Sequence, residues 1–290
     1  MASWAIRTFK VRGHRMWLDK LYHTLNPVAF QLGPLAVRWY GIAYVAGFVV
    51  AGIIIWRTAR RWKLDLSSDD VMSAVIGVAI GIIVGARLGY VLFYGAGYYL
   101  ANPLKALAFN EGGMSFHGGL AGGLVGGSIA CRALRISIPT MCDLAVIGAP
   151  WGLFFGRCAN FINGELWGKP TDLPWGVMFS DSGGGAVYRH PSQLYEAILE
   201  GLVLFAVLYA LSRRYPPRPQ GTFMGAFLVL YGCFRFLIEF VRLPDAQLGY
   251  LLGTNWLTMG QCLSMPLVLV GMGILAASCK QRRPQEGTVA

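Results

Sequence analysis

The sequence predicts an all-α membrane protein, a bundle of about seven transmembrane helices. Of its 290 residues, 55% are hydrophobic and only 13% are charged, and the apolar residues form long runs. Soluble domains carry about 25% charged residues, so about half of the usual charge is missing. Many of the 38 glycines fall within the apolar runs, where small residues let membrane helices approach closely.

Seven segments have the length and apolar character of a span, because about 20 helical residues cross a hydrocarbon core about 30 Å thick. We expect spans at residues 39–56, 71–94, 116–134, 141–161, 192–212, 221–241 and 257–279. These runs lack the alternation of barrel strands, and helices satisfy their own backbone groups in lipid. The third, glycine-rich segment and the fourth, which runs on into a polar motif, are the weakest of the seven.

The remaining ranges complete the predicted organisation. Residues 1–25 form an N-terminal extension, and Met16 offers an alternative start, so residues 1–15 are either an extension or a misassigned beginning. The bundle occupies residues 26–279 and includes an outer loop at 162–191, long enough to suggest a function. Residues 280–290 are expected to form a disordered polar tail in the cytoplasm.

Basic residues between the segments predict the orientation. Twelve lysines and arginines follow the odd-numbered segments, whereas the opposite loops hold four. The positive-inside rule therefore places the C-terminus in the cytoplasm and the N-terminus outside. Five basic residues within residues 1–20 oppose this assignment. Because the basic residues cluster between apolar runs, the net charge of +11 does not indicate nucleic-acid binding.

Ionisable side chains within apolar segments usually mark a functional site or a buried pair. Those found are Arg87, His117, Arg157, Arg235 and Glu239. A guanidinium fork matches phosphate oxygens, so three arginines in one bundle predict a site for an anion such as a phospholipid headgroup. Arg235 and Glu239 are four residues apart and are expected to pair on one helix face.

Simple ion pairing is the alternative explanation for the arginines. Each would then only neutralise a carboxylate or cap a helix, and the available carboxylates are Glu165, Glu196, Glu200, Glu239 and Asp143. His117, which precedes two glycines, is a candidate general base or a histidine that donates to a neighbouring helix. Asp69 and Asp70 follow Ser67 and are expected to cap a helix. The sequence has no metal-binding cluster and no nucleotide-binding loop, so we expect neither metal nor cofactor.

Five sequence blocks resemble the bacterial prolipoprotein diacylglyceryl transferases. The most specific block is residues 156–168, GRCANFINGELWG. The others are residues 37–41 (VRWYG), 116–120 (FHGGL), 189–196 (RHPSQLYE) and 235–245 (RFLIEFVRLPD). The likeness runs from about residue 26 to residue 275 in the family's order, and residues 1–15 fall outside it.

The resemblance implies a transferase that moves the diacylglyceryl group of phosphatidylglycerol to the lipobox cysteine of a preprolipoprotein. A thioether forms and glycerol phosphate leaves, without a metal or a nucleotide. It also implies a multi-pass protein of the bacterial cytoplasmic (inner) membrane. Its partners would be phosphatidylglycerol, lipobox peptides and the lipid bilayer, with no nucleic acid, and we expect a monomer.

Roles are assigned to individual residues by motif. The expected catalytic residues are His117, Arg157, Arg235 and Tyr40, and those expected to bind the headgroup are Arg157, Asn160, Arg235 and Gly168. Glu239 is expected to orient Arg235 and Glu165 to orient Arg157, with Arg87 also supporting the site.

The chemistry accounts for part of this assignment. The arginines would stabilise charge that grows on the phosphate, and the attacking group would be the thiolate. His117 either accepts the thiol proton or holds a headgroup oxygen. The rival prediction is an anion or lipid transporter lined by the arginines, which the absence of internal repeats disfavours.

Overall fold

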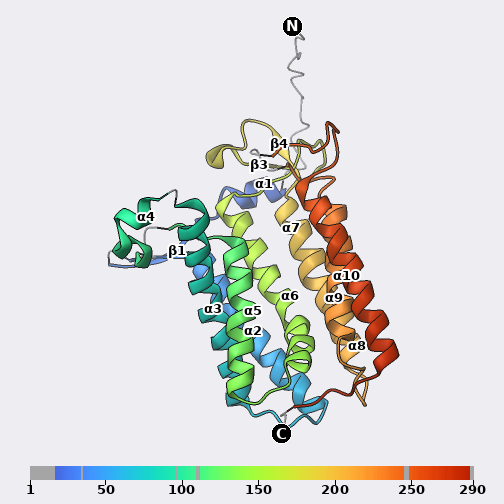
Figure 1. Ribbon diagram of the computed structural model, residues 1–290. Coiled ribbons are helices and arrows are strands. Elements are labelled where there is room, and N and C mark those ends of the chain that lie inside the picture. Colours follow the sequence, from blue (N-terminus) through green and yellow to red (C-terminus); the bar gives the residue numbers. More distant parts are fainter. Residues whose placement is uncertain (1–16, 34, 96, 109–111, 245–247, 288–290) are drawn as a thin grey trace.

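The computed structural model describes residues 17–33, 35–95, 97–108, 112–244 and 248–287, so the predicted extension at 1–15 lies outside it. Long helices run alternately up and down and form a bundle (Figure 1). They are α2 (Trp39–Arg61), α3 (Ser68–Tyr94), α5 (Phe116–Ala133), α6 (Ile138–Asn163), α9 (Thr222–Ile238), α10 (Met259–Gln281), and a continuous helix formed by α7 (Ser192–Glu196), η4 (Ala197–Val203) and α8 (Leu204–Ser212). Each predicted segment overlaps one of them.

Among the described residues, five helices are long and apolar enough to cross a membrane: α2, α3, α6, the helix 192–212, and α10. Helix α9 is apolar but has only 17 residues. The predicted class, a polytopic helical membrane protein, is therefore confirmed.

Shorter elements gather mainly at one end of the bundle. Helix α1 (Trp17–Tyr22), the antiparallel strands β3 (Val177–Met178) and β4 (Tyr188–Arg189), and the turn η3 (Ser180–Ser182) lie there (Figure 1). The antiparallel hairpin of β1 (Val28–Leu32) and β2 (Leu35–Arg38) and the helical turns α4 (Tyr98–Ala101) and η1 (Pro103–Leu107) complete the elements. Figure 1 shows α4 and β1 to one side of the long helices.

Helices α3 and α5 pack backbone against backbone, which explains the glycine-rich third segment. The facing glycines are Gly77, Gly81, Gly85 and Gly89 on α3 and Gly118, Gly122 and Gly126 on α5. A Cβ atom on Gly122 would overlap the carbonyl oxygen of Gly81 and lie 2.8 Å from the Cα of Gly85. In lipid, such close approach replaces the hydrophobic effect as the source of helix association. The glycines of α5 are therefore required for its close packing against α3.

The apolar core lies in the half of the bundle farther from β3 and β4. It contains Ile54 from α2, Leu144 and Ile147 from α6, Leu208 from α8 and Phe223 from α9. These residues belong to the last turns of α2 and α8 and the first turns of α6 and α9. The opposite half of the same helices is therefore where a polar site can be built.

The C-terminal tail corrects one prediction, because residues 283–287 are packed against the bundle. The buried carboxylate of Asp143 accepts hydrogen bonds from the backbone N–H groups of Gly221 and Met224, both at 2.8 Å, and from Gln285 Nε2 at 2.7 Å. The Glu286 N–H donates to Thr140 Oγ1 at 3.0 Å. Polar composition suggested disorder, but a buried acceptor on α6 holds this part of the tail.

Asp143→Ala is expected to lower the free energy of unfolding by about 3 kcal/mol, because it leaves buried donors without their charged acceptor. Thermal unfolding in detergent measures the loss, and protease sensitivity of the tail should rise with it. Asp69→Ala, at the exposed start of α3, is the matched control and should change stability by less than about 1 kcal/mol. Equal effects of the two substitutions would contradict the role assigned to Asp143.

Candidate functional site

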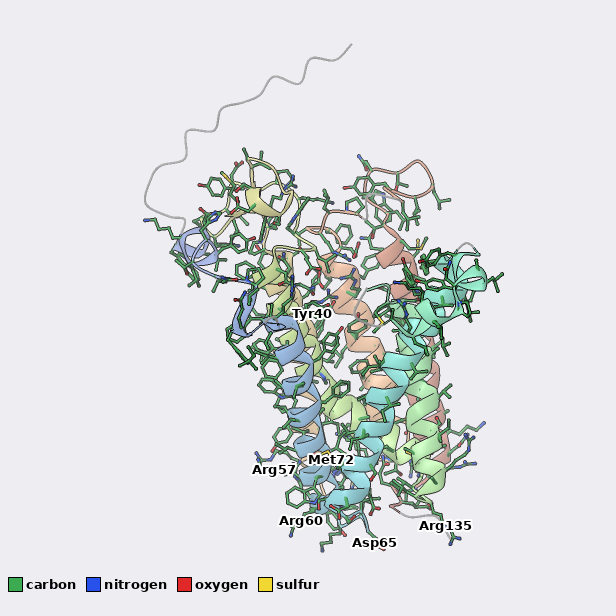
Figure 2. The ribbon with its side chains drawn as sticks, turned by 90° about the vertical axis from the view of Figure 1, so that its left-hand side faces the viewer. Tyr40, Arg57, Arg60, Asp65, Met72 and Arg135 are labelled. Atoms are coloured by element: carbon green, nitrogen blue, oxygen red, sulfur yellow. The ribbon has the colours of Figure 1, made fainter. Side chains whose placement is uncertain are left out.

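Alternating helix directions bring the predicted site residues to one end of the bundle. Tyr40 lies at the start of α2 and His117 at the start of α5, whereas Arg157 and Arg235 lie in the last turns of α6 and α9. Figure 2 shows Tyr40 far along α2 from Arg57 and from the other labelled residues at the opposite end. These four predicted site residues therefore share one end of the bundle.

Six charged side chains from three parts of the chain form what we call the Arg–Glu cluster: Arg157, Glu196, Glu200, Arg235, Glu239 and Arg242. Glu196 is at its centre. Its Oε2 lies 2.6 Å from Arg157 Nε, and its Oε1 lies 3.3 Å from Arg235 Nη1 and 3.9 Å from Arg242 Nε. Glu200 Oε2 lies 3.7 Å from Arg157 Nη2. One carboxylate therefore connects the arginines of α6 and α9.

Glu239 holds the second side of the cluster. Its Oε1 lies 2.5 Å from Arg235 Nη2 and 3.2 Å from Arg242 Nη1. Its Oε2 accepts a hydrogen bond from the Thr258 hydroxyl at 2.5 Å. A Cβ on Gly260 would lie 2.5 Å from the same carboxylate, so the first turn of α10 closes against it. The pairing of Arg235 with Glu239 is as expected from their spacing.

Burial is unequal within the cluster. The side chains of Glu196 and Glu200 are fully buried, whereas those of Arg157 and Arg235 keep 18% and 13% of their area exposed. Buried ions are costly unless paired, so the carboxylates explain how the arginines are tolerated. Ion pairing thus identifies the partners of the two arginines, and both arginine side chains remain partly exposed beside them.

Local packing fixes the two central carboxylates. The helix 192–212 widens into a π-helical stretch at Ala197–Val203, a feature frequent at functional sites. Gly201 lets this stretch approach α6, because a Cβ there would lie 2.7 Å from the Cβ of Phe154. Upstream, Ser192 Oγ donates to the Leu166 carbonyl at 2.9 Å. The outer loop and α6 together therefore set the position of Glu196 and Glu200.

Gly168 lies where the outer loop contacts the chain segment that carries Arg242, a member of the cluster. Its N–H donates to the His190 carbonyl at 2.9 Å, and its strand-like bridge partner is Arg242. A Cβ at this position would lie 2.7 Å from the Val241 carbonyl oxygen. Only glycine fits here, so its motif position has a packing reason independent of ligand binding.

Asn160 and Tyr40 lie on α6 and α2 at the end of the bundle that holds the cluster. Asn160 follows Arg157 by one turn of α6 and is buried. The Tyr40 ring lies 5.2 Å from that of Tyr44. Both residues that are predicted to contact the headgroup therefore lie at the same end of the molecule as Arg157.

His190, in the outer loop, is held neutral at neutral pH. Burial lowers its pKa, and the positive charge of Lys169 lowers it further. Its Nδ1 lies 3.2 Å from the Tyr195 hydroxyl, which is also the acceptor for Trp175 Nε1 at 2.7 Å. The histidine is therefore part of the polar packing that fixes the loop.

Arg87 is bound by backbone carbonyl groups of the connection between α3 and α5. Its guanidinium donates to the carbonyls of Lys105 and Ala106 at 2.6 and 2.8 Å, and to those of Gly112 and Gly113 at 2.5 and 3.2 Å. Arg157 and Arg235 therefore share Glu196, whereas Arg87 braces the connection between α3 and α5.

The connection between α3 and α5, which Arg87 braces, leads into the helix turn that carries His117. The Ser115 N–H donates to the Ala86 carbonyl at 2.9 Å, and the Ser115 hydroxyl caps α5 by accepting from the Gly118 N–H at 3.2 Å. His117 is exposed in the first turn of α5. Within the described residues, no hydrogen bond or ion pair joins it to the Arg–Glu cluster.

Arg87→Met is expected to loosen residues 105–108 and 112–113 and to lower stability by about 3 kcal/mol or more, because four carbonyls lose a charged donor. Hydrogen–deuterium exchange should show faster exchange there than in α9. Arg213→Met, an exposed substitution of the same size, serves as the control. Unchanged exchange in these residues would contradict the bracing role.

Glu165 also differs from its expected role. Its carboxylate accepts a hydrogen bond from Asn163 Nδ2 at 2.7 Å, whereas the ion-pair partners of Arg157 are Glu196 and Glu200. The sequence analysis named Glu196 and Glu200 only as possible ion-pair partners of the arginines, and it did not include Arg242. A signal was present, since two carboxylates four residues apart within an apolar segment share a helix face.

Comparison with known proteins agrees with this arrangement. The family model described as prolipoprotein diacylglyceryl transferase matches residues 27–277. Among curated relatives named phosphatidylglycerol–prolipoprotein diacylglyceryl transferase, that of Geobacter sulfurreducens is 52% identical over 248 residues, which cover 86% of this chain and 93% of the relative. That of Mesorhizobium japonicum is 46% identical over 273 residues, 91% of this chain and 95% of the relative. The chain belongs to the prolipoprotein diacylglyceryl transferase family.

Proposed function

We propose that this protein transfers the diacylglyceryl group of phosphatidylglycerol to the lipobox cysteine thiol of preprolipoproteins and releases glycerol phosphate. The observation that carries the proposal is the Arg–Glu cluster, in which two arginine side chains are partly exposed while the carboxylates of Glu196 and Glu200 are buried. It occurs in a chain that matches the family over residues 27–277.

The reaction breaks the bond between the glyceryl carbon and a phosphate oxygen and forms a carbon–sulfur bond. The electron pair of the broken bond stays on the phosphate, so negative charge grows there in the transition state. Arg157 and Arg235, whose side chains are partly exposed, are proposed to bind the phosphate and stabilise that charge. Glu196 and Glu239 position the two guanidiniums, and holding both substrates together supplies the proximity contribution.

The thiol must lose its proton, because the thiolate is the nucleophile. His117, exposed in the first turn of the glycine-rich helix α5, is proposed as the base. Tyr40 and Asn160 are proposed to contact the headgroup, with Gly168 keeping the outer loop against the cluster. The enzyme acts as a monomer, and no metal, cofactor or nucleic acid takes part.

The proposed topology has seven spans in the bacterial inner membrane, with the Arg–Glu cluster toward the outer surface and the C-terminus in the cytoplasm. Support comes from the seven long helices and from the basic residues at the end of the bundle opposite the cluster. This orientation gives the site access to an exported cysteine and to phospholipid headgroups.

Purified protein supplied with phosphatidylglycerol, a lipobox peptide and a chelator tests the function. Thioether-linked peptide and released glycerol phosphate are expected in equal amounts. A folded sample that gives no product but carries anions across liposome membranes would instead identify a transporter.

His117→Gln tests the role of the base. Proton removal by a positioned histidine contributes about 100- to 10,000-fold, so the rate should fall within that range and its dependence on pH should change. A variant that keeps a substantial rate with the same pH profile would exclude His117 as the base. Phe116→Leu, at the exposed neighbouring position, controls for local disturbance of the helix start.

A further inference from the structure

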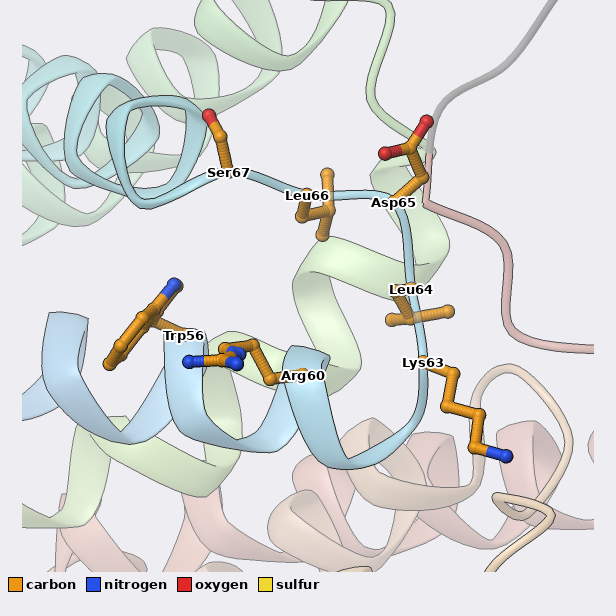
Figure 3. A pocket seen from close by; sticks show the side chains of 7 residues that line it. All are labelled: Trp56, Arg60, Lys63, Leu64, Asp65, Leu66 and Ser67. Carbon is orange, nitrogen blue, oxygen red and sulfur yellow. The ribbon is translucent and has the colours of Figure 1, made fainter.

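A groove lies where α2 turns into α3, at the end of the bundle away from the Arg–Glu cluster. It has a volume of about 630 Å³ and is lined by Trp56, Arg60, Lys63, Leu64, Asp65, Leu66 and Ser67 (Figure 3). We infer that this groove binds the headgroup of an anionic phospholipid from the membrane leaflet at this end of the bundle.

The first argument is an uncompensated positive charge. Within the described residues, neither Arg60 nor Lys63 has a carboxylate oxygen within 4 Å, in contrast to the cluster arginines. The Arg60 guanidinium carbon lies 5.2 Å from the centre of the Trp56 ring. Figure 3 shows Arg60 reaching toward Trp56, whereas Lys63 and Asp65 point away from them. A planar guanidinium held against an aromatic ring can donate hydrogen bonds to the oxygens of a phosphate group.

The second argument is an apolar path that leads away from the groove. Val45, Val49, Ile53, Trp56 and Arg60 follow one another at spacings of four, four, three and four residues, so they share one face of α2. Val45, Val49 and Ile53 are exposed by 64%, 49% and 44%. An acyl chain can lie along this face while its headgroup meets Arg60. A free phosphate ion would gain nothing from such a stripe, so the geometry favours a lipid.

The surrounding charge supports the same occupant. Arg57 and Arg135 lie at this end of the bundle with Arg60 (Figure 2). Basic side chains near an anionic leaflet contribute about 1 kcal/mol each to membrane attraction, and tryptophan favours the interface between headgroups and acyl chains. Arg60 is twenty residues along α2 from Tyr40, which is about 30 Å. The groove is therefore separate from the proposed catalytic site.

Lipid retention by the full-length protein tests the inference. The groove variant Arg60→Gln is compared with Arg213→Gln, which removes the same charge from an exposed position at the same end. Each protein is titrated in detergent with phosphatidic acid, phosphatidylcholine or inorganic phosphate, and bound lipid is counted by native mass spectrometry. Phosphatidic acid is used because it carries a phosphate headgroup but is not the proposed substrate.

We expect the groove variant to bind one phosphatidic acid fewer, or to bind it about tenfold more weakly, while the control keeps it. Trp56→Leu should weaken phosphatidic acid binding as well. Equal losses in the Arg60→Gln and Arg213→Gln variants would overturn the inference in favour of diffuse charge attraction. Equal binding of phosphatidylcholine, or full competition by inorganic phosphate, would overturn it too. Diacylglyceryl transfer with excess phosphatidylglycerol should be unchanged, which separates this outcome from failure of the proposed function.

Discussion

Arg157→Met is expected to reduce diacylglyceryl transfer about a thousandfold or more, because in the proposed reaction Arg157 stabilises the charge that develops in the transition state. The loss should appear in kcat as well as in kcat/KM, since the interaction strengthens as the phosphate departs. Arg157→Lys should recover little, because an ammonium cannot replace the planar fork that contacts both Glu196 and a phosphate. Turnover of the peptide, with product identified by mass spectrometry, measures the effect.

A second substitution separates this catalytic role from a purely structural one. Removing Arg157 leaves Glu196 and Glu200 with one positive charge too few, and an unpaired buried carboxylate costs about 3–5 kcal/mol. Adding Glu200→Gln restores the charge balance of the Arg–Glu cluster. The double variant should therefore regain thermal stability but not activity. Recovery of activity in the double variant would show that Arg157 serves only as an ion-pair partner.

Gly122→Leu is expected to prevent the native pairing of α3 and α5. Even a single Cβ at this position would overlap the carbonyl oxygen of Gly81 and lie 2.8 Å from the Cα of Gly85. These neighbours are backbone atoms of a regular helix, so no side-chain rotation can relieve the overlap. The cost should exceed the usual 1–3 kcal/mol of overpacking. Unfolding in detergent and the yield of monodisperse protein report the loss.

The matched control is Gly273→Ala in α10, where nothing lies within 4 Å of the added Cβ. That change should leave the structure intact and add up to about 1 kcal/mol through higher helix propensity. If Gly122→Leu behaved like this control, the close contact of α3 with α5 would not be needed for folding. Because His117 begins α5, activity should fall together with the native pairing.

Local features of the site could be predicted from the sequence, and long-range ones could not. Arg235 and Glu239 lie on one helix, so their spacing was enough to predict the pair. The partner of Arg157 is Glu196, which comes from a helix that a 28-residue connection separates from α6. No pattern within either helix indicates that they are neighbours. Glu165, close to Arg157 in the chain, was therefore chosen in its place.

The same limit applies to the fold. Runs of apolar residues indicated where each long helix lies, because the bilayer sets their length. The glycines of α5 were visible in the sequence, but their partners on α3 became clear only when the two helices were seen together. Asp143 also depends on contacts between residues that are far apart in the chain. Its burial depends on donors from the start of α9 and from Gln285, so the polar tail was wrongly predicted to be disordered.

The equal numbers of arginines and carboxylates in the Arg–Glu cluster have a consequence for turnover. Phosphatidylglycerol is a phosphodiester with one negative charge, whereas glycerol phosphate is a monoester whose charge approaches two at neutral pH. A site with a large positive excess would hold the more highly charged product more tightly than the substrate. A site with balanced charge can stabilise the phosphate locally, at Arg157 and Arg235, without binding the departing anion more tightly than the substrate. We therefore expect glycerol phosphate to be a weak competitor of its own precursor.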